Sequence, residues 1–306
     1  MTFNLHFAGS CSKESDQHLK NVGAYRLFSQ LTEKSTLERW EASGYGNRLI
    51  IDSGAFSVAH NNSTVDIDEY IRYINRHTEV AVWVELDVIP FPILNNETAL
   101  RSCELSWSNY VYMRERLPPN LILLPLYHFG EPKFALTRIL NTAIDGNLPT
   151  YIGVGGRHGV STQEQIKYFE WVFDVIKHSH NPNVRVHAFG ITTPQILEKF
   201  PFYSADSTAW IKAAAFGEIM LRHTLSRVPV SKETCKYGRN IAHASELAFN
   251  RVEEDVRYFG YTIEQLAEDV ESRRQYNIDA MYEWSQHCGT LDRKVKSTKR
   301  LFSPTN

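Results

Sequence analysis

Three short segments, Asp52-Ser-Gly-Ala-Phe56, Glu85-Leu-Asp87 and Tyr203-Ser-Ala-Asp206-Ser-Thr208, each place an acidic residue at the end of an apolar, strand-like run. The strand ends of a barrel or of an open parallel sheet meet at one rim, so an acid that ends a strand points towards a shared pocket. Packing alone gives no reason for three such acids spread over about half of the chain. The three segments therefore predict an enzyme with its site at the rim of an α/β fold.

The rest of the N-terminal two thirds alternates between strand-like and helical patterns. The predicted strands are Leu5–Ala8, Arg48–Asp52, Val80–Ile89, Leu121–Tyr127, Thr150–Val154, Val184–Phe189, Phe202–Ala205 and Glu218–Leu221. Segments with helical spacing, such as Glu97–Leu117 and Thr162–His178, separate most of them. Strands separated by helices imply parallel βα units, and eight of them favour a closed (β/α)8 TIM barrel over an open sheet.

The alternation stops after about residue 225, which predicts two regions. Residues 1–225 form the catalytic barrel, and residues 226–306 form a helical C-terminal extension with amphipathic helices over Asn240–Phe259 and Thr262–Cys288. The chain ends in a basic tail that contains Arg293, Lys294, Lys296, Lys299 and Arg300. Such a tail suits a phosphate backbone, and a solvated chain end explains it equally well.

Composition narrows the class of protein. The chain has 306 residues, 42% hydrophobic and 22% charged, and a net charge of −2, which indicates a folded protein without a global basic field. It shows neither a membrane span nor an N-terminal leader, so we expect a cytoplasmic protein that has no contact with membranes. Its four cysteines lack the close spacing of a disulfide framework or a metal site.

The predicted rim combines residue types that suit sugar chemistry. Two carboxylates across a pocket, here Asp52 and Asp206, allow one to attack a carbon atom while the other handles protons. A third carboxylate, Asp87, can accept the paired N–H donors of a ring such as guanine. Each acid taken alone is also explained as a turn or helix-capping residue.

Other rim residues fit a flat ring as the substrate. Gly155 and Gly156 would let a ring or its exocyclic oxygen approach backbone N–H groups closely. Phe56 offers a stacking face. His128 is interpreted as a polar rim residue rather than a metal ligand, and His187 in the sixth predicted strand is interpreted as a satisfied core histidine.

In their order along the chain, these segments resemble the tRNA-guanine transglycosylases, also called queuine or archaeosine tRNA-ribosyltransferases. The matching segments are Asp52–Phe56, Glu85–Asp87, Leu126–Gly130, Gly153–Gly156, Phe189–Pro194 and Tyr203–Ser207. The resemblance implies that Asp206 is the nucleophile, that Asp52 is the second catalytic acid, and that Phe56 stacks on the base. It further implies that Asp87, His128, Gly155 and Gly156 bind the base edge. Ser53 and Tyr127 lie within the matched motifs and complete the predicted substrate-binding set.

Departures from that pattern point to one branch of the family. Thr208-Ala-Trp210 replaces the phosphate-side PTR motif, and Ser57 replaces a glutamine. Of the family's structural zinc site only Cys235, His243 and Cys288 remain as candidate ligands, so we do not expect zinc. In these respects the chain is most similar to the DNA-modifying DpdA-type branch of phages and genomic islands, which would place it in a host cell's cytoplasm if a phage encodes it.

The resemblance implies a pentosyltransferase that exchanges guanine in DNA for a 7-deazaguanine such as preQ0 through a covalent Asp206–glycosyl intermediate. The expected partners are DNA and the free base, with a homodimer or a helper protein left open, and the chemistry requires neither a metal nor a redox cofactor. Three alternatives remain: the same exchange on tRNA, a non-catalytic partner subunit that binds nucleic acid or base, and an ordinary barrel glycosidase.

Overall fold

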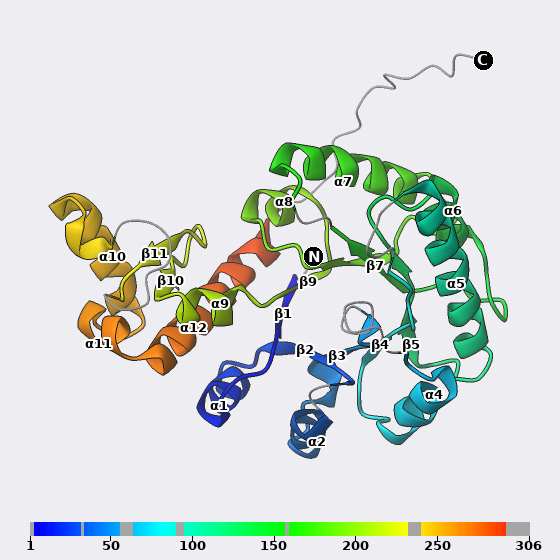
Figure 1. Cartoon of the computed structure of the whole chain (residues 1–306), viewed down its shortest axis with the longest axis horizontal. Coiled ribbons are helices and arrows are strands. Elements are labelled where there is room, and N and C mark those ends of the chain that lie inside the picture. Colours follow the sequence, from blue (N-terminus) through cyan, green and yellow to red (C-terminus); the bar gives the residue numbers. More distant parts are fainter. Residues whose placement is uncertain are drawn as a thin grey trace, which may run out of the picture.

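The computed structural model describes residues 3–31, 34–55, 64–89, 95–156, 159–231 and 240–291. Nine parallel strands form one sheet that curls into a nearly closed barrel, in the order β5-β4-β3-β2-β1-β9-β8-β7-β6 (Figure 1). They are β1 (Asn4–Ala8), β2 (Tyr25–Ser29), β3 (Leu49–Asp52), β4 (Val82–Val84), β5 (Ile122–Leu124), β6 (Leu126–Tyr127), β7 (Tyr151–Gly155), β8 (Arg185–Phe189) and β9 (Ser204–Ser207). The α/β class and the barrel-like sheet predicted from the sequence are confirmed.

Helices form an outer layer around these strands (Figure 1). They are α1 (Lys13–Asn21), α2 (Lys34–Ala42), α4 (Ile67–Arg76), α5 (Asn96–Arg114), α6 (Lys133–Asn141), α7 (Thr162–Lys177), α8 (Pro194–Lys199) and α9 (Ala209–Ala215), with a 3-10 turn at Gly46–Arg48. Side-chain caps fix where several of them begin, and α5 and α7 carry full capping boxes at Asn95 and Ser161. A large apolar core fills the space between the helices and the outer face of the sheet.

A single predicted strand is divided at Pro125, and the division joins the two ends of the sheet. β5 pairs with β4, while β6, directly after Pro125, pairs with β7. Proline has no N–H to donate, but its carbonyl accepts a 2.8 Å hydrogen bond from Gly153. The N–H of Leu126 donates to the Glu85 carboxyl at 2.6 Å. The Glu85 side chain therefore bridges β4 and β6 where the regular ladder is interrupted.

Two strand predictions were wrong. β2, which lies between β1 and β3, was not predicted. A charged residue, Arg26, is the second residue of β2, but it is fully buried, donates to the Gly9 carbonyl at 2.9 Å and lies over the Phe28 ring. Glu218–Leu221, predicted as the eighth barrel strand, instead forms β10 (Glu218–Met220), which pairs antiparallel with β11 (Arg227–Pro229) outside the barrel.

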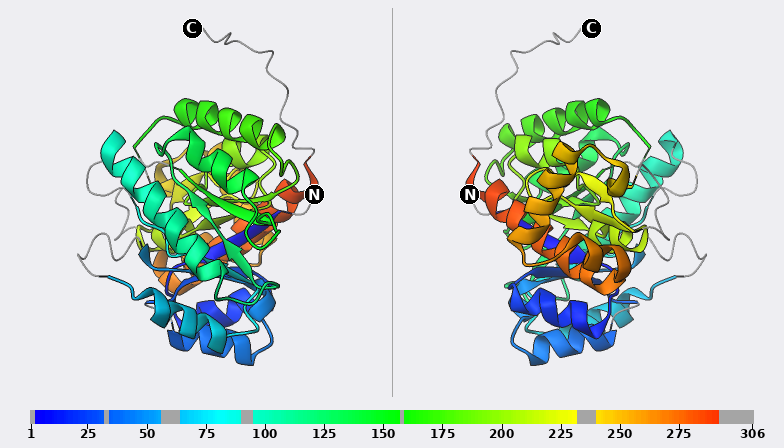
Figure 2. Two further views of the ribbon diagram at one scale, coloured as in Figure 1. Left: turned by 90° about the vertical axis from the view of Figure 1, so that its right-hand side faces the viewer. Right: turned by 90° about the vertical axis from the view of Figure 1, so that its left-hand side faces the viewer.

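The helical C-terminal extension is present and is anchored to the barrel. It contains a 3-10 turn (Ile241–His243), α10 (Glu246–Tyr258), α11 (Ile263–Glu268) and α12 (Val270–Thr290). α12 contributes Tyr276 and Ala280 to a small core with β10 and α10, and Ile278, Met281 and Trp284 to the main core. Figure 2 shows this helix running from the extension to the barrel. The basic tail lies outside the described residues, and no described helix is long and apolar enough to cross a membrane.

Candidate active site

The two acids predicted to carry the chemistry lie on β3 and β9, which β2 and β1 separate in the sheet. Asp52 ends β3, and Asp206 lies within β9, in register with His6 of the adjacent β1. Side chains alternate along a strand, and because Ala205 packs in the outer core, Asp206 faces the barrel interior. Burial, the charge of Asp87 and the charge of Asp206 raise the pKa of Asp52 to about 7. The three predicted acids therefore share one electrostatic environment.

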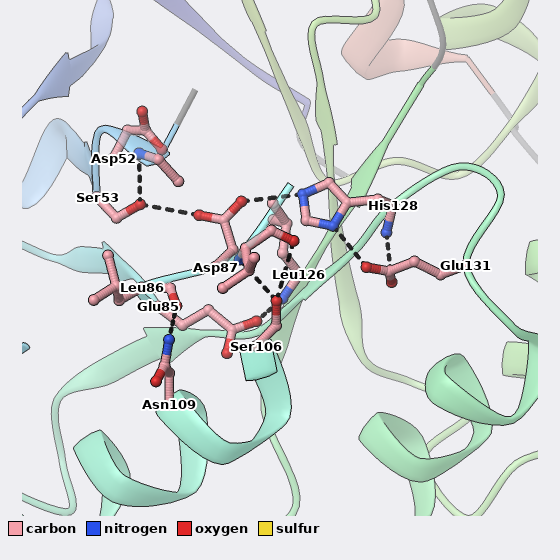
Figure 3. A network of polar contacts seen from close by, with 12 residues as sticks. Asp52, Ser53, Glu85, Leu86, Asp87, Ser106, Asn109, Leu126, His128 and Glu131 are labelled. Carbon is pink, nitrogen blue, oxygen red and sulfur yellow. Dashed lines mark hydrogen bonds and ion pairs between the residues drawn. The ribbon is translucent and has the colours of Figure 1, made fainter. Parts of the chain in front are cut away.

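Asp87 belongs to a chain of polar contacts that Figure 3 shows in close view. One carboxylate oxygen accepts a 2.9 Å hydrogen bond from the Ser53 hydroxyl, and the other lies 3.0 Å from Nε2 of His128. The opposite ring nitrogen of His128 lies 3.0 Å from Oε1 of Glu131, and the His128 N–H donates to the second oxygen of Glu131. The side chains of Asp87 and Glu131 are only 3% and 1% exposed, so the imidazole is enclosed by two buried carboxylates.

This arrangement sets the charge of His128. Burial alone would lower its pKa, but the hydrogen bonds to Asp87 and Glu131 outweigh burial and raise the pKa to about 10. At neutral pH the ring is an imidazolium that neutralises one of the two carboxylates. Because each oxygen of Asp87 already has one donor, a ligand at this site would use the remaining lone pairs.

Asp206 is held at one of its two oxygens. Oδ1 accepts a 2.9 Å hydrogen bond from the N–H of Gly190, in the turn that follows β8. The same oxygen lies 3.4 Å from Nε2 of His187, and the Asp206 side chain is 14% exposed. His187 is fully buried, as the sequence predicts, but its Nε2 atom faces Asp206 and has no hydrogen-bond partner within the described chain.

The predicted glycines are explained partly by packing. A Cβ atom on Gly156 would lie 2.0 Å from the Ile191 side chain, and the Gly156 N–H already points to the Phe189 carbonyl at 3.4 Å. Gly155 is different, since its Cβ would lie 3.5 Å from Cδ2 of His128, which is ordinary contact. Of this pair, Gly155 has the open side next to His128.

Two other residues predicted to contact the substrate, Tyr127 and Phe56, do not join the acids in the described structure. Tyr127 is buried in the outer core, beside Tyr168 and Trp171, and its hydroxyl donates to the Glu131 carbonyl at 2.9 Å. The structure thus gives Tyr127 the role of fixing the turn after β6. Phe56 lies outside the described residues.

No group of three or more His, Cys, Asp or Glu side chains in the described residues is arranged to hold a metal ion. Cys235, one of the three candidate zinc ligands, lies outside those residues. Cys288 is buried in the main core, where its thiol is 3.7 Å from the Leu197 carbonyl. It therefore serves the packing of α12 against α8.

Several polar residues around the acids were not predicted from the sequence. Glu131 follows His128 by three residues in the turn before α6, and that spacing alone carries no specific signal. Ser204 and Tyr151 face His187 from neighbouring strands, which only the strand register reveals. Comparison with protein-family models and with curated proteins gives no match.

Proposed function

We propose that this protein exchanges guanine in DNA for a 7-deazaguanine base through a covalent Asp206–glycosyl intermediate. The observation that carries the proposal is the pair Asp52 and Asp206. One carboxyl has its pKa raised to about 7, and the other is held by the backbone N–H of Gly190. A proton-handling acid and a nucleophile in one electrostatic environment are the parts that retaining glycosyl transfer needs.

The proposed reaction proceeds in two displacements without strand cleavage. The target guanine is flipped out of the stack, at a cost of a few kcal/mol. An oxygen of Asp206 attacks C1′, the C1′–N9 bond breaks, and Asp52 gives a proton to the departing guanine. The incoming base then loses its N9 proton to Asp52 and attacks C1′, which releases Asp206 and restores both acids with net retention.

The network around Asp87 is proposed to read the base edge. Asp87 keeps a lone pair on each oxygen for the N–H groups of a guanine-like ring, and Ser53 and His128 hold its carboxylate in place. Gly155 provides the open backbone next to His128. In this proposal β5 and β6 count as one strand bent at Pro125, so that eight strands form a (β/α)8 barrel with the site at its C-terminal rim.

An exchange assay with labelled guanine tests the proposal and separates the substrates. Wild-type protein is incubated with duplex DNA or bulk tRNA, and incorporation and covalent protein–nucleic acid adducts are measured. We expect exchange on DNA, with Asp206→Asn abolishing both exchange and adduct. If exchange occurred only with tRNA, the substrate would be tRNA and not DNA. An absence of adduct would favour a non-catalytic partner subunit, and full turnover by Asp206→Asn would refute the nucleophile assignment.

A further inference from the structure

The interior of the barrel below Asp206 holds a row of polar side chains that the proposed reaction does not use. His187 lies on β8, and Ser204 is its register partner on β9. The Nδ1 atom of His187 is in close contact with the Ser204 hydroxyl, which in turn contacts the hydroxyl of Tyr151 on β7. All three side chains are buried, so water does not compete for these contacts.

The donors and acceptors along this row favour one tautomer of His187. Burial raises the pKa of Tyr151 well above its usual value, so its hydroxyl keeps a proton that it can donate. If Tyr151 donates to Ser204, the Ser204 proton is directed at Nδ1 of His187, which then accepts. A neutral imidazole that accepts at Nδ1 carries its proton on Nε2. That N–H faces Oδ1 of Asp206 at 3.4 Å.

The opposite tautomer would place a lone pair of Nε2 against the Asp206 carboxylate, which is repulsive. The other titratable group that faces the ring is His6 of β1, whose ring centre is 5.5 Å away. Burial and the neighbouring His187 lower the pKa of His6 well below its usual value, so His6 is neutral. His6 therefore adds no charge beneath Asp206.

We propose that His187 is a positioning residue for Asp206, with Tyr151 and Ser204 fixing its tautomer. Its Nε2–H and the Gly190 N–H both engage Oδ1, which leaves Oδ2 as the oxygen that attacks the sugar. This inference rests on the proposed function. The 3.4 Å separation is longer than a good hydrogen bond, and such contacts at catalytic sites commonly shorten when substrate binds.

Four variants and a control test the inference through single-turnover adduct formation and affinity for free preQ0. We expect His187→Phe to slow adduct formation about 10- to 100-fold, the effect of losing a hydrogen bond to a charged group, with base affinity unchanged. His187→Gln keeps an N–H donor and should recover most of the rate. Ser204→Ala and Tyr151→Phe should fall in between, while Tyr73→Phe, which removes another buried hydroxyl, should match wild type. A His187→Phe protein that folds and keeps the full rate would overturn the proposal.

Nitrogen-15 NMR of the His187 ring gives a readout that needs no activity. We expect the neutral Nε2–H tautomer in wild type, and a mixture of tautomers in Ser204→Ala. A neutral Nδ1–H ring or a charged ring in wild type would overturn the positioning role, even if His187→Phe failed to fold. Absence of any adduct in wild type would instead refute the proposed function, so the two failures are distinguishable.

Discussion

Nε2 of His128 lies 3.0 Å from Oδ2 of Asp87, and Nδ1 of the same ring lies 3.0 Å from Oε1 of Glu131. One imidazolium thus serves two buried carboxylates that come from different strand ends. Without its charge, both acids would be buried and unpaired, which proteins avoid because an isolated buried charge is costly. The relationship makes His128 the centre of the site's electrostatics.

Replacing Glu131 with glutamine should lower the pKa of His128 from about 10, because one of the two carboxylates that raise it is removed. A raised histidine pKa stabilises the fold fully below the unfolded value of about 6.5, and this contribution is lost as the pH rises through about 10. We therefore expect Glu131→Gln to lose about 1–3 kcal/mol of unfolding free energy at pH 7 and less at pH 10.5.

Urea unfolding at the two pH values and a histidine NMR titration measure these effects. Glu104→Gln is the control, since it removes a different carboxyl group, one that pairs with Arg138 at 2.9 Å. Equal losses by Glu131→Gln at both pH values would contradict the prediction.

Replacing Asp52 with asparagine should stabilise the protein relative to wild type at high pH. The folded pKa of about 7 exceeds the unfolded value of about 3.9, so the ionised wild-type protein loses stability as the pH rises between the two. The advantage of Asp52→Asn should therefore be larger at pH 8 than at pH 4, by thermal unfolding. Asp145→Asn, on an exposed turn, should show no such trend, and a constant difference for Asp52→Asn would exclude a raised pKa.

Two substitutions at Glu85 should separate its hydrogen bond from its charge. Burial raises the pKa of Glu85 well above its usual value, so the side chain is a neutral acid that accepts from the Leu126 N–H. Glu85→Gln keeps an acceptor and should stay within about 1 kcal/mol of wild type, whereas Glu85→Met leaves that N–H buried and unpaired at a cost of about 1–3 kcal/mol. Chemical denaturation measures the stability of both variants. Equal stability of the two would contradict a stabilising role for the hydrogen bond between Glu85 and the Leu126 N–H.

Two glycines on β7 should respond differently to alanine. At Gly153 a Cβ would lie 2.1 Å from Leu126 and 2.5 Å from Phe189, and overpacking of this kind costs about 1–3 kcal/mol. At Gly155 the nearest atom is 3.5 Å away, so the fold should be unaffected. The added methyl group lies beside His128, and under the proposed function Gly155→Ala should weaken preQ0 binding. Calorimetric titration measures the affinity for preQ0. An unchanged affinity would show that Gly155 does not contact the base.

The sequence alone determined the α/β class, the C-terminal helices and the presence of Asp52, Asp87 and Asp206 at or close to strand ends, because these follow from local periodicity. It did not reveal β2, since Arg26 breaks the apolar pattern and its burial depends on distant partners, nor that β10 leaves the barrel.

Tertiary structure decided the protonation and the contacts of the site. The pKa of Asp52, the charge of His128 and the contact of His187 with Asp206 arise from side chains that are far apart in the sequence and meet only when the strands align. Burial and neighbouring charge set these properties, and both are consequences of register rather than of residue type.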